Sequence, residues 1–243
     1  MPRAVDDDFL ALGEFINSYS LGAAMTDHDF AACLKYGHRT YFCLLYFWSH
    51  MQFLVSKCKL NIGGVQVTPE STIIAYMKEC VSDIGSGLFC CFHGAYKPAS
   101  MSLRSSVENF LRFSAGLSDP QALKTSSVFE LFDLAAKTPQ FAGPSRKFHS
   151  QLREVYSELC KDTHTASLDN MAGIHALNHF PKFEPIKFKH WTKQANQVVV
   201  AVATVLTLAS PELLLKAHFK TQENIEPIIA TKERKALLAG HKN

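Results

Sequence analysis

An uncharged stretch of 17 residues, Thr40 to Ser56, constrains the fold more than any other part of the sequence. It contains no Lys, Arg, Asp or Glu and is dense in Phe, Leu and Tyr. About 20 apolar residues are needed to span a bilayer, and Ser49, His50 and Gln52 interrupt this stretch with polar side chains. We therefore expect a buried core helix over about residues 28–58, apolar nearly all round. Membrane association through residues 40–56 is kept as an alternative.

The composition favours helices over strands. Only 12 Gly and 10 Pro occur in 243 residues, too few for the turns of an all-β sandwich or barrel, and 47% hydrophobic content is ample for a core. We predict an all-α fold, a compact helical bundle with an N-terminal helical extension. Residues 1–97 are expected to form an N-terminal helical region packed on the main body, which comprises residues 98–243.

The spacing of apolar residues and the flanking turn residues locate the other helices. Residues 61–69 have turn chemistry and predict a loop or a minor hairpin, and residues 84–96 are left unassigned. One helix is expected to start at Thr68 or Ser71 and to end near Ser82, and another to start at Ser100 or Ser102 and to stop at Gly116. Further helices are predicted over about residues 128–137, 145–164, 168–179, 193–209 and 211–220.

The cysteines and the first residues indicate the compartment. Seven Cys, an odd number without a CxxC pair, lie mostly in apolar runs, as is typical of buried reduced thiols rather than a disulfide framework. The acidic cluster Asp6 to Asp8 is not followed by a long apolar segment, which is unlike a signal peptide. We expect a cytoplasmic protein without a metal or cofactor. The sequence also lacks GxxxxGK[ST], GxGxxG, GxSxG and HExxH, which argues against the enzyme classes that use them.

The net charge of +3 is unevenly distributed. Residues 1–145 contain 11 Lys and Arg against 13 Asp and Glu, whereas residues 146–243 contain 14 against 9. An anionic partner would therefore meet the C-terminal part of the chain, unless this charge is only a solvated basic face.

The predicted helix that ends at Gly116 carries a stripe of charged residues. Arg104, Glu108 and Arg112 follow one another at four-residue intervals, opposite the apolar face. This spacing is common on a solvated helix face. It would also allow Arg104 or Arg112 to bind a phosphate that Glu108 and Asn109 orient.

A second group of functional residues is expected near the end of the helix over residues 145–164. Tyr156, Cys160 and His164 recur at four-residue intervals. His164 at a helix C-terminus is explained structurally by the helix dipole. In a functional interpretation it is a general acid or base, with Lys161 or an Arg supplying positive charge to a phosphodiester.

Together, the segments SLRSSVENFLRF (Ser102–Phe113) and YSELCKDTHT (Tyr156–Thr165) resemble the HEPN-like helical domains of bacterial toxin, abortive-infection and RNA-processing proteins. The resemblance covers about residues 99–210. It implies a helical bundle that is usually dimeric, and in many members a metal-independent endoribonuclease. In that family an Arg, four to six residues and then a His form the active site, brought together across the dimer.

The sequence departs from this pattern at the arginine. Glu158 stands six residues before His164, and no Arg has the required spacing. The resemblance therefore supports His164 alone, and Arg104 from the other helix is our candidate for its partner. With Glu108, Asn109 and Tyr156, these residues form the candidate catalytic set. A catalytically degenerate version that binds RNA or serves as a scaffold is equally consistent with the missing Arg.

Two further patterns involve aromatic, basic or histidine residues. Residues 181–193 interleave lysines with Phe183, Phe188 and Trp191, which would suit stacking on single-stranded RNA. Alternatively, these rings anchor a loop to the core. His175 and His179 are spaced to share a metal ion, but no further ligand pattern supports a metal site. The candidate nucleic-acid-binding residues are Arg112, Lys161, Lys187, Lys189, Trp191 and Lys193.

Two functions follow as hypotheses. The first is an HEPN-like protein that binds or cleaves RNA, within a phage-defence (antiviral) or toxin–antitoxin setting that only the resemblance suggests. The second is a non-enzymatic helical subunit that assembles with itself, as a homodimer, or with a partner protein.

Overall fold

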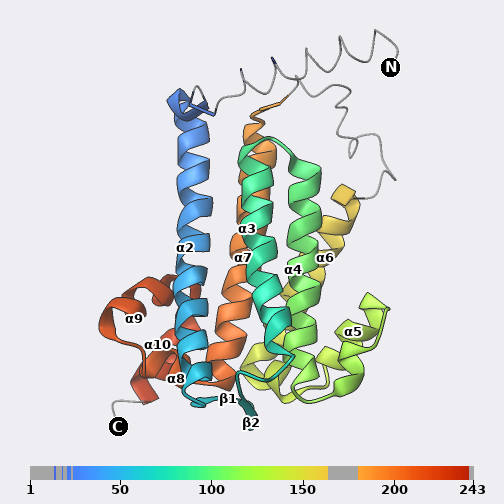
Figure 1. Cartoon of the computed structure of the whole chain (residues 1–243), viewed down its shortest axis with the longest axis vertical. Helices are drawn as coiled ribbons and strands as arrows, with labels where there is room; N and C mark the ends of the chain where they lie inside the picture. The colour runs from blue at the N-terminus through green and yellow to red at the C-terminus, as the bar shows by residue number, and fades with distance from the viewer. Residues whose placement is uncertain (1–13, 15–17, 19–20, 23, 164–179, 241–243) are drawn as a thin grey trace.

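The computed structural model describes residues 14, 18, 21, 22, 24–163 and 180–240, and it is an all-α, compact helical bundle (Figure 1). The longer helices are α2 (His28–Ser56), α3 (Ile74–Phe92), α4 (Tyr96–Gly116), α6 (Arg146–Thr163) and α7 (Pro185–Ala209). The shorter helices are α5 (Val128–Ala135), α8 (Glu212–Leu215), α9 (Phe219–Ile225) and α10 (Thr231–Gly240). Single 3-10 turns cover Ala24–Thr26, Pro120–Leu123, Pro139–Phe141, Gly143–Ser145 and Glu226–Ile228.

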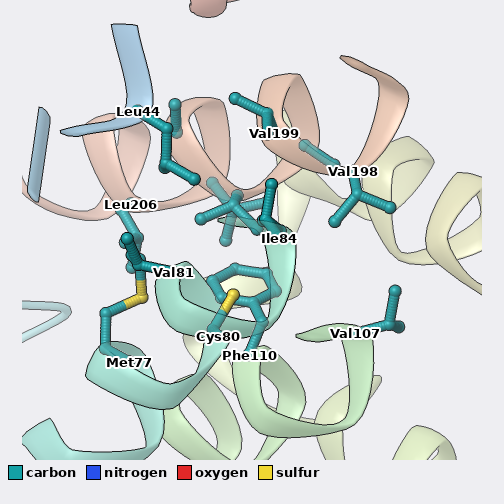
Figure 2. Packing of buried hydrophobic residues seen from close by; sticks show 14 of the residues in the cluster. Leu44, Met77, Cys80, Val81, Ile84, Val107, Phe110, Val198, Val199 and Leu206 are labelled. Carbon is teal, nitrogen blue, oxygen red and sulfur yellow. The ribbon is translucent and has the colours of Figure 1, made fainter. Parts of the chain in front are cut away.

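The long helices run side by side along the length of the molecule, with α2 at one edge (Figure 1). Helix α7 packs against α2, α3, α4 and α6, so it is the centre of the bundle. Figure 2 shows side chains of α2, α3, α4 and α7 pointing toward one another, among them Leu44, Ile84, Phe110 and Val198. All four are at most 1% exposed. The core is therefore built jointly by helices from both ends of the sequence.

This joint core does not follow the predicted division at residues 97 and 98. Both residues lie in the first turn of α4, and α4 packs extensively against α3 on the other side of that boundary. One cluster of buried residues extends from Phe30 to Ile229. The described residues thus form a single bundle, because α3 and α4 bury their apolar faces against each other.

Helix α2 begins as the sequence predicts, but only one of its faces is buried. Asp27 caps it by accepting a hydrogen bond from the backbone N–H of Phe30 at 2.9 Å. The buried stripe repeats at helical intervals and includes Phe47 and Met51, both 0% exposed. The opposite face is also apolar, yet it is exposed. The expectation that the whole uncharged stretch lies in the core is therefore wrong for half of the helix.

The segment predicted as a loop or minor hairpin is a two-stranded hairpin. Strands β1 (Leu60–Ile62) and β2 (Val65–Val67) are antiparallel, and Leu60 pairs with Val67. Gly63 and Gly64 link them with φ angles of 59° and 91°, which other residues adopt at a cost.

Several helices differ in extent from the prediction, and the one helix expected over residues 211–220 is two, α8 and α9. Helix α3 continues to Phe92, through most of residues 84–96, for which the sequence predicts no state, and α4 begins at Tyr96. Pro98 is accommodated in the first turn of α4, where backbone N–H groups have no partner within the helix. Helix α7 begins at Pro185 rather than near Lys193, since proline is equally well tolerated at its first position.

The cysteines in the core are buried, as expected. Cys33, Cys43, Cys80 and Cys91 are at most 6% exposed and form no disulfide. Burial raises the pKa of each of these four thiols. Among the described residues, no helix is long and apolar enough to cross a membrane.

Candidate functional site

The structure brings Arg104, Glu108 and Tyr156 together between α4 and α6. The phenolic hydroxyl of Tyr156 donates a hydrogen bond to Glu108 Oε1 at 2.9 Å. Arg104 Nε lies 3.7 Å from the same oxygen. We call these three residues the Arg104 cluster. These three residues of the candidate catalytic set therefore lie close together in space, although 48 residues separate Glu108 from Tyr156.

Local sequence and packing explain how the Arg104 cluster forms. Arg104 and Glu108 are four residues apart and therefore lie on one face of α4. Tyr156 comes from α6, which packs against α4, and its ring lies 5.5 Å from the Phe132 ring of α5 in an edge-on arrangement. Phe132 is 1% exposed and fixes one side of the tyrosine.

The electrostatics of the Arg104 cluster keep Tyr156 protonated. Burial raises the pKa of Tyr156, and the hydrogen bond to Glu108 raises it further. The guanidinium carbon of Arg104 lies 5.9 Å from the centre of the Tyr156 ring, within the range of a cation–π contact. Glu108 thus receives a hydrogen bond from a neutral phenol and faces a cation, and both contacts orient its carboxylate.

The side chains of Glu108 and Arg104 remain partly accessible to solvent. Their exposed fractions are 25% and 29%. A cation that is held in position and remains partly accessible can meet an anion such as phosphate.

Asn109 and Arg112 do not join the Arg104 cluster. Asn109 Nδ2 donates a hydrogen bond to Asp83 Oδ2 of α3 at 2.9 Å. Arg112 donates to the backbone carbonyl of Ala122 at 3.0 Å. These contacts tie α4 to its neighbours in the fold, so both side chains are engaged with the protein itself.

His164, the predicted general acid or base, lies outside the described residues, as do His175 and His179. Helix α6 is described up to Thr163, the residue before His164. Lys161 in its last turn is exposed and donates to Glu158 Oε1 at 2.7 Å.

The basic and aromatic stretch at residues 181–193 forms the first turns of α7 and the segment before it. Phe188 is 0% exposed and Trp191 is 3% exposed. The Trp191 indole packs so closely over Gly87 of α3 that a Cβ there would lie 2.7 Å from Cζ2. The predicted role of Trp191 in stacking on bases is therefore wrong. Residues 188 and 191 are three apart on the helix face that turns toward the core, so they anchor α7.

The lysines of this stretch lie on the outer face of α7. Lys187 Nζ is 3.0 Å from Glu184, and Lys189 Nζ is 4.0 Å from Asp29. Lys193 is also exposed. Partial burial acts to raise the pKa of Glu184, but hydrogen bonds from Lys187 and Lys182 lower it overall. Carboxylates therefore already offset part of this basic charge.

One contributor to the site escaped the sequence analysis. Phe132, which supports Tyr156, belongs to a short helix whose place in the fold no local pattern reveals. Arg153 of α6 does not join the Arg104 cluster, because its Nη1 lies 3.5 Å from Asp133 Oδ1.

Within the described ranges, no cluster of His, Cys, Asp and Glu has the makings of a metal site. Comparison of the chain with protein-family models, with curated proteins and with solved structures found no match.

Proposed function

We propose that the protein binds RNA at the Arg104 cluster and cleaves it without a metal ion, as an HEPN-like endoribonuclease. The observation that carries the proposal is the arrangement of Arg104, Glu108 and Tyr156 at hydrogen-bond and ion-pair distances. These residues belong to the two segments that resemble the HEPN-like family. That resemblance also suggests a dimer and a phage-defence or toxin–antitoxin role.

In this proposal Arg104 binds a non-bridging oxygen of the scissile phosphate. His164 removes the proton from the adjacent 2′-hydroxyl, and the 2′-oxygen attacks phosphorus. The bond from phosphorus to the 5′-oxygen breaks, and the leaving oxygen receives a proton from the imidazolium. The charge that develops on the phosphorane is stabilised by Arg104. Glu108 and Tyr156 are positioning residues, since they hold the guanidinium rather than contact RNA.

The test is incubation of the purified protein with transfer RNA or total RNA in EDTA, followed by gel electrophoresis. We expect cleavage by the unaltered chain, and a loss of about 100-fold or more in His164→Ala and in Arg104→Ala. Arg153→Ala is the matched control, because it removes an exposed arginine of α6 that is paired with Asp133. Equal cleavage by His164→Ala and the unaltered chain, or no cleavage by either, contradicts the assigned reaction.

Binding without cleavage is measured separately, by fluorescence anisotropy with a labelled single-stranded RNA at several salt concentrations. Arg104→Ala is expected to reduce the slope of log affinity against log salt by about one. An affinity that is weak and nearly independent of salt contradicts RNA binding altogether.

Assembly without catalysis is the second candidate function. The exposed apolar face of α2 favours it, because contiguous apolar patches on folded proteins commonly mark interaction sites. Light scattering across a concentration series would show a stable oligomer if this function is correct.

A further inference from the structure

One side of α2 is exposed along the uncharged stretch of the sequence. The exposed residues recur with the spacing of a single helix face. Helix α9 packs on another side of α2 and leaves this face open. Since residues 40–56 contain no Lys, Arg, Asp or Glu, the face carries no charge. We call its residues the α2 stripe: Phe42, Leu45, Tyr46, Ser49, Gln52, Phe53 and Ser56.

The apolar members of the α2 stripe offer enough area for an interface. Phe42 and Leu45 are each 39% exposed, Tyr46 is 37% exposed and Phe53 is 55% exposed. Side chains of this size bury about 200 Å² when fully covered, so these fractions amount to on the order of 350 Å² per copy. Apolar area makes up about 60% of an interface, so two copies would bury about 1,200 Å² in all. Specific interfaces begin at about this size.

The α2 stripe is symmetric about Ser49. Positions 42 and 56, 45 and 53, and 46 and 52 are equidistant from Ser49, and all six are exposed. In a twofold dimer, each contact of residue i with residue j of the partner is repeated as a contact of j with i. Two antiparallel copies of α2 centred on Ser49 therefore oppose an exposed residue to an exposed residue along the whole stripe.

The side chains of the α2 stripe are compatible with such a pair. The small side chain of Ser49 allows the two helices to approach each other at the centre. On one side of the pair Tyr46 lies beside Phe53 of the second copy, and on the other side Leu45 lies beside Gln52. The pair therefore contacts through two aromatic pairs and two smaller ones, and it contains no charged side chain.

Charges flank the α2 stripe, so they lie at the rim of the pair. The neighbouring exposed charges of α3, Lys78 and Glu79, have both signs. At the two ends of the pair, cations of one copy approach cations of the other in contact with solvent. Salt screens such a repulsion beyond about 10 Å, so it weakens the pair only at low ionic strength. The exposed cations at the two ends are Lys35, Arg39, Lys57 and Lys59.

We propose that a second copy of the chain covers the α2 stripe, in an antiparallel pair of α2 helices with Ser49 at the twofold axis. The proposal rests on the assembly function, for which it names the partner and the face. It does not depend on RNA cleavage, because the Arg104 cluster lies on α4 and α6, and α6 is on the other side of the bundle from α2 (Figure 1). The pair thus differs from the dimer that the family resemblance implies, in which the active site lies across the interface.

The test is sedimentation equilibrium of the full chain over a series of protein concentrations. We expect a monomer–dimer equilibrium that is several-fold tighter in about 0.5 M than in about 0.05 M NaCl, since salt screens the cations at the rim. Association that is bridged by RNA or by anionic lipid weakens with salt instead.

Ser49→Arg and Ser49→Glu test the position of the axis. Each variant opposes two like charges at the centre of the pair and is expected to dimerise about 100-fold more weakly than the unaltered chain. An equimolar mixture of the two variants brings opposite charges together there. The mixture is expected to recover dimerisation to within about tenfold of the unaltered chain.

Ser150→Arg is the matched control. It makes the same substitution at an exposed serine of α6 and is expected to leave dimerisation unchanged. Circular dichroism and the urea midpoint establish that each variant is folded, so that a loss of dimer is assigned to the interface.

Four results overturn the proposal. A chain that stays monomeric at every concentration refutes both this pair and self-assembly. An oligomer that Ser49→Arg leaves intact refutes this pair and assigns self-assembly to another face. A mixture that associates no more tightly than either variant alone removes Ser49 from the axis. Association that requires phosphatidylglycerol vesicles assigns the α2 stripe to a lipid surface.

Discussion

The hydroxyl of Tyr156 donates to Glu108 Oε1 at 2.9 Å and thereby joins α6 to α4. The pKa of Tyr156 is raised, first by burial and then by this hydrogen bond, so the phenol remains a donor across the physiological pH range. The Arg104 cluster therefore has one arrangement of donors and acceptors.

Tyr156→Phe keeps the ring and removes the donor. We expect the free energy of unfolding in urea to fall by about 0.5–1.5 kcal/mol, because Glu108 loses a partner while partly buried. If the proposed reaction is correct, RNA cleavage also falls, since Arg104 is then less firmly oriented. Tyr36→Phe, at an exposed position on α2, is the control and should change neither quantity. An unaltered stability and activity in Tyr156→Phe would mean that the bond has no role.

Arg104 and Arg112 lie on the same stripe of α4 but are predicted to differ in effect. Arg112→Ala removes the hydrogen bond to the Ala122 carbonyl and should lower the free energy of unfolding by about 1 kcal/mol, with RNA affinity unchanged. Arg104→Ala should lower RNA affinity and its salt dependence instead. Urea unfolding and anisotropy on both variants check this. An equal loss of RNA affinity in the two variants would refute the distinction.

Trp191→Ala should destabilise the bundle by about 3–5 kcal/mol, because it leaves a cavity against Gly87 in the core. Lys193→Ala is the control, because Lys193 lies two residues after Trp191 but on the exposed outer face of α7. Its free energy of unfolding should stay within about 0.5 kcal/mol of that of the unaltered chain. Urea denaturation measures both. A mild Trp191→Ala phenotype accompanied by a loss of RNA affinity would restore the stacking role rejected above.

His50 of α2 makes stability depend on pH. Burial lowers its pKa, although a hydrogen bond with the backbone of Glu212 acts in the opposite direction. The folded state thus binds a proton less readily than the unfolded state. The contribution of His50 to stability is present above its unfolded pKa of about 6.5 and is lost as the pH falls through the lower folded value.

The measurement is urea unfolding at pH 7.5 and pH 5.0 in the unaltered chain and in His50→Leu. The loss of stability on acidification should be smaller in His50→Leu. Replacement of exposed His38 by Leu serves as the control, and its acid loss should match that of the unaltered chain. A full acid loss in His50→Leu would assign the pH dependence to other groups.

The helices themselves were largely predictable, because apolar spacing and capping residues act locally. Gly116 ends α4 as the sequence predicts, whereas the predicted N-caps Ser100 and Ser102 lie inside α4, which begins at Tyr96. The extent of burial was not predictable for α2. When a helix is apolar on every side, its sequence does not indicate which side meets the core, because that depends on where α7 packs.

The site was predictable only where it depends on local spacing along one helix. The spacing of Arg104 and Glu108 places them on one face without any knowledge of the fold. Their contact with Tyr156 depends on how α4 packs against α6. Trp191 was misassigned because residues 181–193 were treated as a loop. The apolar residues of this stretch recur at intervals of three and four beyond Lys193. They are Phe188, Trp191, Ala195 and Val198, and they form a buried helix face.

The central position of α7 also has a consequence for synthesis of the chain. Its last residue, Ala209, is made 153 residues after the end of α2 at Ser56. At about 5–20 residues per second, translation leaves the core-facing stripe of α2 without its main partner for on the order of ten seconds. During that interval the nascent chain presents an aromatic-rich apolar helix to the cell. An apolar stripe exposed for that long is a surface through which the unfinished chain can aggregate.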